Sequence, residues 1–195
     1  METTKDRILN TTAELFRRYG YTGTGMKQIV AQAEAPFGSI YHFFPGGKEQ
    51  LGQDVIRRSG QMYRDLFETI VGSAPDLITG VQYFFTGAAE VLRHSDYADA
   101  CPIATVALEV ASTSEPLREA TADVFESWIE AGIARFTAAG VPRSQARELA
   151  ILFLASLEGA FILCRATRST EAMDIASAAT MQALRSALPT TAALG

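Results

Sequence analysis

Apolar residues recur every three or four positions through almost the whole of this chain, and this spacing restricts the folds open to it. In residues 3–20 ("TTKDRILNTTAELFRRYG"), for example, Ile8, Leu15 and Phe16 fall on one face of a helix. Runs with the alternating pattern of a β-strand are absent. Proline and glycine divide the periodic pattern into about nine helical segments. The sequence therefore predicts an all-α protein.

The expected helices lie at residues 3–20, 26–35, 35–44, 48–72, 75–94, 101–112, 114–140, 142–168 and 171–188. Thr3 and Asp6 have the spacing of a capping box for the first helix, and Gly20 stands where that helix is expected to stop. We expect residues 189–195 to form a frayed end.

The composition is that of a soluble protein with a sizeable core, since 48% of its 195 residues are hydrophobic. The most apolar run, Leu149 to Cys164, is shorter than the roughly 20 residues that cross a bilayer, and Glu158 interrupts it. We therefore expect no membrane span and no signal peptide. Cys101 and Cys164 form no metal or redox motif, which fits free thiols in a reducing cytoplasm.

Charge is distributed unevenly along the chain. The net charge is −5, but residues 1–60 hold eight basic and six acidic side chains (8 − 6 = +2). Residues 61–195 carry the remaining nine basic and sixteen acidic side chains (9 − 16 = −7). A mildly basic N-terminal part on an acidic body indicates that only the first part meets a polyanion, although an excess of +2 is also within ordinary scatter.

Three short helices are expected before the long helix that starts near residue 48. The second and third are separated by "AEAP" (residues 33–36), which is about the length of the turn in a helix-turn-helix motif. In such a motif the second of these two helices lies in the major groove of DNA and reads base edges.

Residues 3–51 resemble the TetR family of transcriptional regulators. The matching pieces are "AELFRRYGY", "TGTGMKQIVAQA" and "GSIYHFFPGGKEQL", and the doubled glycine of "PGGK" with the later "CPIATVALE" is similar to the LmrA/YxaF-type branch of drug-responsive repressors. The resemblance implies a helix-turn-helix DNA-binding domain at residues 1–47. Residues 48–195 would then form a helical bundle for effector binding and dimerisation. The implied function is a repressor that binds a palindromic operator as a homodimer, uses no cofactor and is released by a small effector.

The resemblance also indicates which residues meet DNA. Tyr41 and His42 are expected to bond phosphate oxygens, Ser39 a base or a phosphate, and Lys48 a phosphate at the start of the long helix. For His42, capping or packing is an equally good interpretation. Ile40 and one of the two residues Phe43 and Phe44 are expected in the core. The full set of DNA-binding candidates is Thr24, Lys27, Pro36, Phe37, Gly38, Ser39, Tyr41, His42 and Lys48.

Two positions depart from the family pattern. The turn position usually taken by glycine is Glu34, where a positive φ would cost on the order of 1 kcal/mol. The residue that is often basic before "GS" is Phe37, whose ring cannot pair with guanine but can touch a thymine methyl. Base preferences taken from the family are therefore unreliable here, and phosphate contacts and DNA shape are expected to supply much of the specificity.

An effector pocket is implied in the helical body. Trp128 is the strongest single candidate, because an indole N–H needs a polar partner when it is buried. The lining is expected to be apolar and aromatic, which favours an uncharged or weakly polar, ring-containing effector. For any one of these residues, plain core packing is the competing interpretation. The candidates are Met62, Phe84, Phe85, Cys101, Ile103, Phe125, Trp128 and Phe161.

The two C-terminal helices are expected to form a dimer contact. Apolar residues point in nearly every direction around residues 149–164, so that helix needs a neighbour on each side. The last helix carries small residues at spacings that permit close approach of a second helix, at Ala172, Ala176, Ala179 and Ala183. Together the pair is expected to form an isologous four-helix contact, and a central core helix is the alternative.

Two other function classes compete with a DNA-binding regulator. An enzyme is disfavoured, because "PGGKEQ" lacks the residues of a phosphate-binding loop and neither His42 nor His94 has a Cys or Ser nearby in a catalytic pattern. Metal-binding spacing is also missing. The remaining alternative is a helical adaptor or small-molecule-binding protein without DNA binding, which would not need Ser39, Tyr41 and Lys48 in this arrangement.

Overall fold

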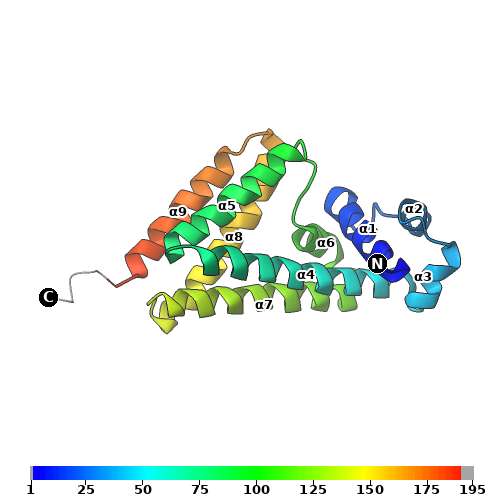
Figure 1. Ribbon diagram of the computed structural model, residues 1–195, viewed down its shortest axis with the longest axis horizontal. Helices are drawn as coiled ribbons and strands as arrows, with labels where there is room; N and C mark the ends of the chain where they lie inside the picture. The colour runs from blue at the N-terminus through cyan, green and yellow to red at the C-terminus, as the bar shows by residue number, and fades with distance from the viewer. Residues whose placement is uncertain (1, 190–195) are drawn as a thin grey trace. The chain divides into compact units, whose positions relative to one another are not determined.

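The computed structural model describes residues 2–189, and within them it is entirely helical, as the apolar spacing predicts (Figure 1). Six of the seven residues expected to fray, 190–195, lie outside this range. The helices are α1 (Thr4–Tyr19), α2 (Met26–Gln32), α3 (Phe37–Phe43), α4 (Gly47–Ser73), α5 (Leu77–His94), α6 (Pro102–Val110), α7 (Glu115–Ala138), α8 (Arg143–Thr167) and α9 (Glu171–Ala187).

The chain forms two compact units. The first, here called the head unit, comprises residues 1–62 and 98–125, and the second, the body unit, comprises residues 63–97 and 126–195. The helices α4 and α7 therefore contribute to both units. The functional boundary expected at residue 47 stays a prediction. The compact units divide elsewhere, because the first part of α4, all of α6 and the first half of α7 also belong to the head unit.

Helix α1 begins and ends with the groups that its sequence predicts. The Thr3 hydroxyl accepts a hydrogen bond from the Asp6 backbone N–H at 3.1 Å, and Asp6 accepts the Thr3 N–H at 3.2 Å, which completes the capping box. Arg58 of α4 donates to the same carboxylate at 2.7 Å. These hydrogen bonds, that of Arg58 first, lower the pKa of Asp6 to about 2. The helix ends at Gly20, which has a φ of 72°.

The core of the head unit fixes the orientation of α3. Ile40 and Phe44 are completely buried, as are Ile8 and Phe16 of α1, and α3 packs against both α1 and α2. Phe44 is the buried member of the neighbouring pair, while Phe43 is only half-buried. Ile40 and Phe44 lie about one helical turn apart and face inward, and Tyr41 and His42 between them are exposed.

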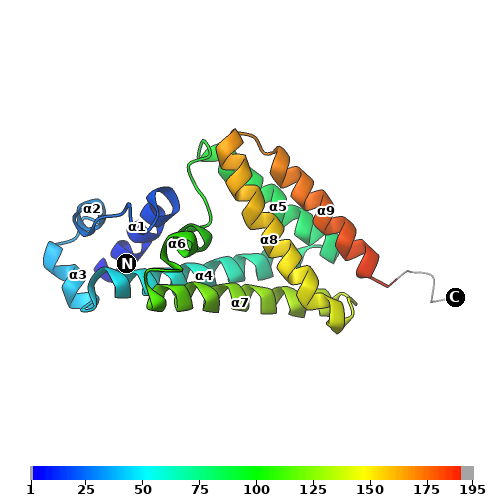
Figure 2. The same ribbon diagram turned by 180° about the vertical axis from the view of Figure 1, so that it is seen from behind.

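In the body unit α5, α8 and α9 lie side by side (Figures 1 and 2). Phe85, Phe136 and Phe153 are central members of its core. Helix α8 is the one described helix that is long and apolar enough to cross a membrane, yet only 28% of its most apolar stretch is buried within the chain. A large part of the apolar surface of α8 is therefore left without cover from its own chain.

Candidate DNA-contact face and effector pocket

The exposed side of α3 is unusually rich in aromatic rings. Phe37 is 47% exposed and Tyr41 is 53% exposed, and their rings meet edge to face with centroids 5.9 Å apart. The four-residue spacing brings them together on one side of the helix, opposite Ile40. Pro36, which is also exposed, immediately precedes the first residue of α3 and starts the helix with a φ of −59°. Phe37, the first residue of α3, thus occupies the end of the helix where base-reading residues are found in such motifs.

Gly38 lies on this exposed side, and the protein itself does not require glycine there. A methyl group added to Gly38 meets no atom within 4 Å, and the backbone is not in the left-handed region. Glycine within a helix costs about 0.5–1 kcal/mol relative to alanine. Since neither packing nor backbone geometry explains this cost, the position is open for the close approach of another molecule.

His42 and Ser39 complete the residues that α3 contributes. His42 is exposed and its ring contacts that of Phe43 edge to face, with centroids 4.9 Å apart. Ser39 is half-buried in the first turn. Lys27, in the first turn of α2, is exposed. The interpretation of His42 as a packing residue therefore stays open beside its role as a DNA contact.

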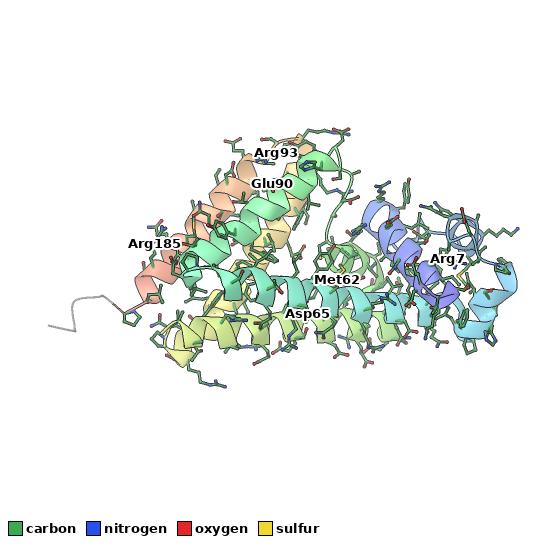
Figure 3. All side chains as sticks on the ribbon, viewed as in Figure 1. Arg7, Met62, Asp65, Glu90, Arg93 and Arg185 are labelled. Atoms are coloured by element: carbon green, nitrogen blue, oxygen red, sulfur yellow. The ribbon has the colours of Figure 1, made fainter. Side chains whose placement is uncertain are left out.

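The turn between α2 and α3 contains a non-glycine residue in the left-handed region. This residue is Glu34, which stands at the turn position usually taken by glycine and has a φ of 49°. Arg7 of α1, labelled in Figure 3, stabilises this turn by donating to the carbonyl oxygens of Ala33 at 3.1 Å and Glu34 at 3.3 Å. These two bonds fix the turn from outside, so the angle between α2 and α3 does not depend on a glycine.

Thr24 requires a correction. Its side chain is completely buried, and its hydroxyl donates to the carbonyl oxygen of Gly20 at 2.7 Å. The backbone N–H of Thr24 is also used, because it bonds the carbonyl oxygen of Tyr21 at 3.2 Å. The residue therefore closes the loop between α1 and α2 and has no exposed group with which to meet a phosphate.

Lys48 is held against the same loop. Its ammonium nitrogen lies 4.3 Å from the centroid of the Tyr21 ring, a cation–π contact. Partial burial lowers the pKa of Lys48, and the negative charge of Glu109 opposes that shift. The lysine stays at the start of α4, where the first N–H groups of the helix lack intrahelical partners and favour an anion.

Glu109 of α6 organises this loop from a distant part of the sequence. One of its carboxylate oxygens accepts the N–H of Tyr21 at 3.1 Å, and the other accepts the N–H of Thr22 at 2.7 Å. Gly20 leaves room for the carboxylate, because a methyl group there would lie 1.7 Å from a Glu109 oxygen. Sequence reasoning missed Arg7, Tyr21 and Glu109, since their partners are backbone groups or a ring and leave no motif.

The body unit contains an aromatic pocket. The space between its lining side chains is about 430 Å³, part of it open to solvent, and the lining is formed by α4, α5, α7 and α8. Phe153 lies within 5.8 Å, centroid to centroid, of both Phe67 and Phe84. The rings of Tyr63 and Trp128 meet edge to face at 6.3 Å. The lining residues are Tyr63, Arg64, Phe67, Phe84, Trp128, Ala131, Ala150, Phe153, Leu154 and Leu157.

Two of the residues expected to bind an effector, Phe84 and Trp128, line this pocket. Phe85 is buried behind it and packs on Phe153, and Phe161 packs at the edge of the core. The structure does not bring the other four to this pocket, because they belong to the head unit: Met62, Cys101, Ile103 and Phe125.

The four residues in the head unit have different environments. Met62 is 51% exposed on α4 (Figure 3), whereas Ile103 is completely buried. Cys101 precedes α6, and its sulfur accepts the N–H of Ala104 at 3.4 Å. The apolar pattern alone did not separate these residues from the lining residues Tyr63, Arg64, Phe67 and Phe153. Among residues 2–189, no cluster of three or more His, Cys, Asp or Glu side chains has the arrangement of a metal site.

Comparison with known proteins gives matches to both parts of the chain. Residues 8–55 match the family described as bacterial regulatory proteins, tetR family. Residues 78–179 match the C-terminal domain of LmrA/YxaF-like transcriptional regulators. The chain is 32% identical to the uncharacterized HTH-type transcriptional regulator YxaF of Bacillus subtilis over 82% of this chain and 83% of that protein. It is 30% identical to the HTH-type transcriptional regulator LmrA of the same organism, over 89% and 93% of the two chains.

Solved structures share the fold. A TetR transcriptional regulator from Legionella pneumophila superposes with a TM-score of 0.84 at 22% identity, covering 94% of this chain and 98% of that one. The reduced form of NemR from Escherichia coli superposes with a TM-score of 0.77, also at 22% identity, covering 98% and 99%. At these identities the likeness concerns the helical architecture.

Proposed function

The chain belongs to the TetR family and is a helix-turn-helix transcriptional regulator with an LmrA/YxaF-like C-terminal domain, and on this premise we propose that it is a ligand-released repressor. As a homodimer in the cytoplasm, it binds a palindromic operator and leaves it when a small ring-containing molecule fills the body-unit pocket. The observation that carries the proposal is the exposed side of α3. Phe37 and Tyr41 are exposed there, and a side chain at Gly38 would meet no other atom of the protein.

Contact with DNA would divide into two kinds. Tyr41, Lys27 and Lys48 supply hydroxyl and ammonium donors for phosphate oxygens, which position α3 in the major groove. To bind a phosphate, Lys48 gives up its cation–π contact with the Tyr21 ring. Phe37 at the start of α3 then meets base edges, with Gly38 allowing the backbone to come close.

Release by an effector requires two conformations with different affinities for DNA. An effector shifts the population only if it binds the state that does not bind DNA more tightly. The pocket is suited to such a ligand, because its lining is mostly aromatic and apolar and contains few polar groups.

Dimerisation is proposed through α8 and α9. Their exposed large apolar residues are Ile151, Leu152, Ile162, Leu163 and Ile175, all between 43% and 62% exposed. A second copy of the same chain is the occupant, because a palindromic site needs two heads and an isologous contact covers the same face on both partners. Of the alanines expected at the dimer contact, Ala172 and Ala176 pack against the chain's own core. Only the other two, Ala179 and Ala183, are proposed to contact the second copy.

A gel-shift experiment with the promoter region of the protein's own gene tests the central proposal. Wild-type protein is expected to bind a roughly palindromic site, and added salt should weaken binding steeply. Tyr41→Ala should lower the affinity, whereas Tyr83→Ala is the matched control, because Tyr83 is 55% exposed on α5 in the body unit. Equal affinity of Tyr41→Ala and wild type would remove Tyr41 from the interface, and absence of any DNA binding would favour the adaptor alternative.

The dimer is tested by light scattering on purified protein. Wild type is expected at twice the chain mass of 21.0 kDa, and Ile162→Glu combined with Leu163→Glu should give the monomer. These two side chains are exposed in the single chain, so the substitution leaves its own core intact. A double variant that stays dimeric would place the interface elsewhere.

A further inference from the structure

Arg64 is the exception in a pocket otherwise lined by apolar and aromatic side chains. It lies on α4, is half-buried, and lines the pocket together with Phe67, Phe84 and Trp128. Within residues 2–189 it forms no hydrogen bond, ion pair or ring contact. A guanidinium in an apolar lining loses hydration, so it normally has an anionic partner or several hydrogen bonds.

The acidic residue at helical spacing from Arg64 is already paired with another arginine. Glu68 stands four residues later on α4, at the spacing that lets oppositely charged side chains meet on a helix. Glu68 instead pairs with Arg135 of α7, which also donates to the Glu68 carbonyl oxygen at 3.1 Å. Arg135 therefore satisfies the acid and leaves the charge of Arg64 uncompensated beside the pocket.

Other arginines of the body unit are bound in ways that Arg64 is not. Arg147 forms a fork with Glu126, and Arg168 bonds Asp96 at 2.9 Å. Arg93 donates to the Thr170 hydroxyl at 3.2 Å, and Arg165 donates to the Tyr97 carbonyl oxygen at 3.3 Å. Arg143 and Arg185 also form no hydrogen bond or ion pair among the described residues, but both are exposed to solvent, whereas Arg64 is half-buried and lines the pocket. Arg64 is therefore the arginine of this unit that is placed to pair with a ligand in the pocket.

We infer that the effector is a planar aromatic carboxylate whose acid group pairs with Arg64 while its rings lie among Phe67, Phe84 and Trp128. This inference rests on the proposed effector pocket and changes the sequence-based expectation of an uncharged or weakly polar effector. Arginine presents a planar fork of donors that matches a carboxylate, and a few placed polar groups in an apolar pocket fix the orientation of a ligand. The unpaired guanidinium therefore selects for charge, and the aromatic lining selects for flat rings.

The test compares 2-naphthoate with its neutral counterpart 2-naphthamide, which has the same rings and almost the same shape. Binding is measured by calorimetry and by the fluorescence of Trp128, which is the only tryptophan of the chain and lines the pocket. Wild-type protein should bind 2-naphthoate at least about tenfold more tightly than 2-naphthamide, because a charge-assisted pair is added. A ratio near one, or no fluorescence change with either compound, would overturn the inference.

Variants at position 64 separate charge from shape. Arg64→Met keeps an apolar stem and should reduce the preference for the carboxylate to about one, whereas Arg64→Lys should retain part of it. Arg143→Met is the matched control, since Arg143 is exposed at the start of α8 and does not line the pocket. A carboxylate preference that survives in Arg64→Met would overturn the role of Arg64.

Operator binding provides an independent arm. If wild-type protein binds its operator but no aromatic acid binds the pocket, the effector class is wrong while the regulator function stands. If it binds no operator, the proposed repressor function fails, whatever the pocket binds. If 2-naphthoate binds and lowers operator affinity in wild type but not in Arg64→Met, both proposals are supported.

Discussion

The proposed DNA-contact face of the head unit and the pocket of the body unit are built in opposite ways. The face consists mainly of consecutive residues on α3, and its outward side chains carry little of the protein's own packing. The pocket draws single residues from α4, α5, α7 and α8, and several of them, such as Phe67 and Phe153, also belong to the core. Binding and stability are therefore separable in the head unit and joined in the body unit.

The largest expected effect is the loss of stability in Phe153→Ala. Phe153 is 7% exposed and its ring contacts those of Phe67, Phe84, Phe85 and Phe136. Removing the ring should lower the free energy of unfolding by about 3–5 kcal/mol, measured by urea titration. Phe37→Ala is the control and should change it by less than about 0.5 kcal/mol, because Phe37 is exposed. Equal losses in the two variants would remove the contrast between the units.

The next largest effect is expected at Gly38, where one substitution should raise stability and lower operator affinity. Gly38→Ala should raise the free energy of unfolding by about 0.5–1 kcal/mol, because the added methyl favours the helix and meets nothing in the protein. Operator affinity should fall about tenfold, since an unaccommodated methyl at a close contact costs about 1–3 kcal/mol. Gly87→Ala on α5, where an added methyl also meets nothing, is the control for the helical effect. Unchanged operator affinity in Gly38→Ala would mean that the DNA backbone or bases do not approach this position.

A smaller effect tests whether Phe37 reads thymine. Replacing operator thymines one at a time by deoxyuridine removes only the 5-methyl group, whose burial contributes about 0.8 kcal/mol. Wild-type affinity should fall about fourfold at one position in each half-site, as measured by fluorescence anisotropy. Phe37→Ala should be insensitive to the same replacement. Sensitivity that persists in the variant would assign the methyl contact to another residue.

The smallest effect concerns the turn before α3. Glu34→Gly should raise the free energy of unfolding by about 0.5 kcal/mol, because relief of the strained φ of 49° slightly exceeds the added flexibility of glycine in the unfolded chain. Operator affinity should stay the same, since Arg7 fixes the turn through two carbonyl oxygens. A loss of stability on thermal melting would show that Glu34 contributes contacts that outweigh the strain.

What the sequence predicts well is local. The capping box of Thr3 and Asp6, the nine helices within residues 2–189 and the inward position of Ile40 all follow from spacing within a few residues. The family resemblance implied an apolar and aromatic pocket, and two of the candidates named for it, Phe84 and Trp128, line the pocket of the body unit. The spacing of apolar residues does not show which face of a core helix borders a pocket. A phenylalanine that lines a pocket and one that packs in the core recur at the same helical spacing.

What the sequence does not predict depends on partners far along the chain. Thr24 was expected to meet phosphate, but its hydroxyl closes its own loop. Arg64 was not selected at all, because its significance comes from the pairing of Glu68 with Arg135, 67 residues away. Which side chains pair between two helices depends on how the helices pack in the folded protein. The sequence pattern of one helix therefore does not predict such pairs.

The contact of Glu109 with the loop between α1 and α2 has a consequence for synthesis of the protein. The two N–H groups that it binds belong to Tyr21 and Thr22, so about 90 residues separate the loop from its acceptor. While the chain is being made, α1 to α3 emerge first, yet their loop stays hydrated until α6 has left the ribosome. We expect amide exchange at these two residues to be fast in a fragment ending at residue 62 and slow in the full chain. An interrupted translation product would then lack the two hydrogen bonds that hold the loop between α1 and α2.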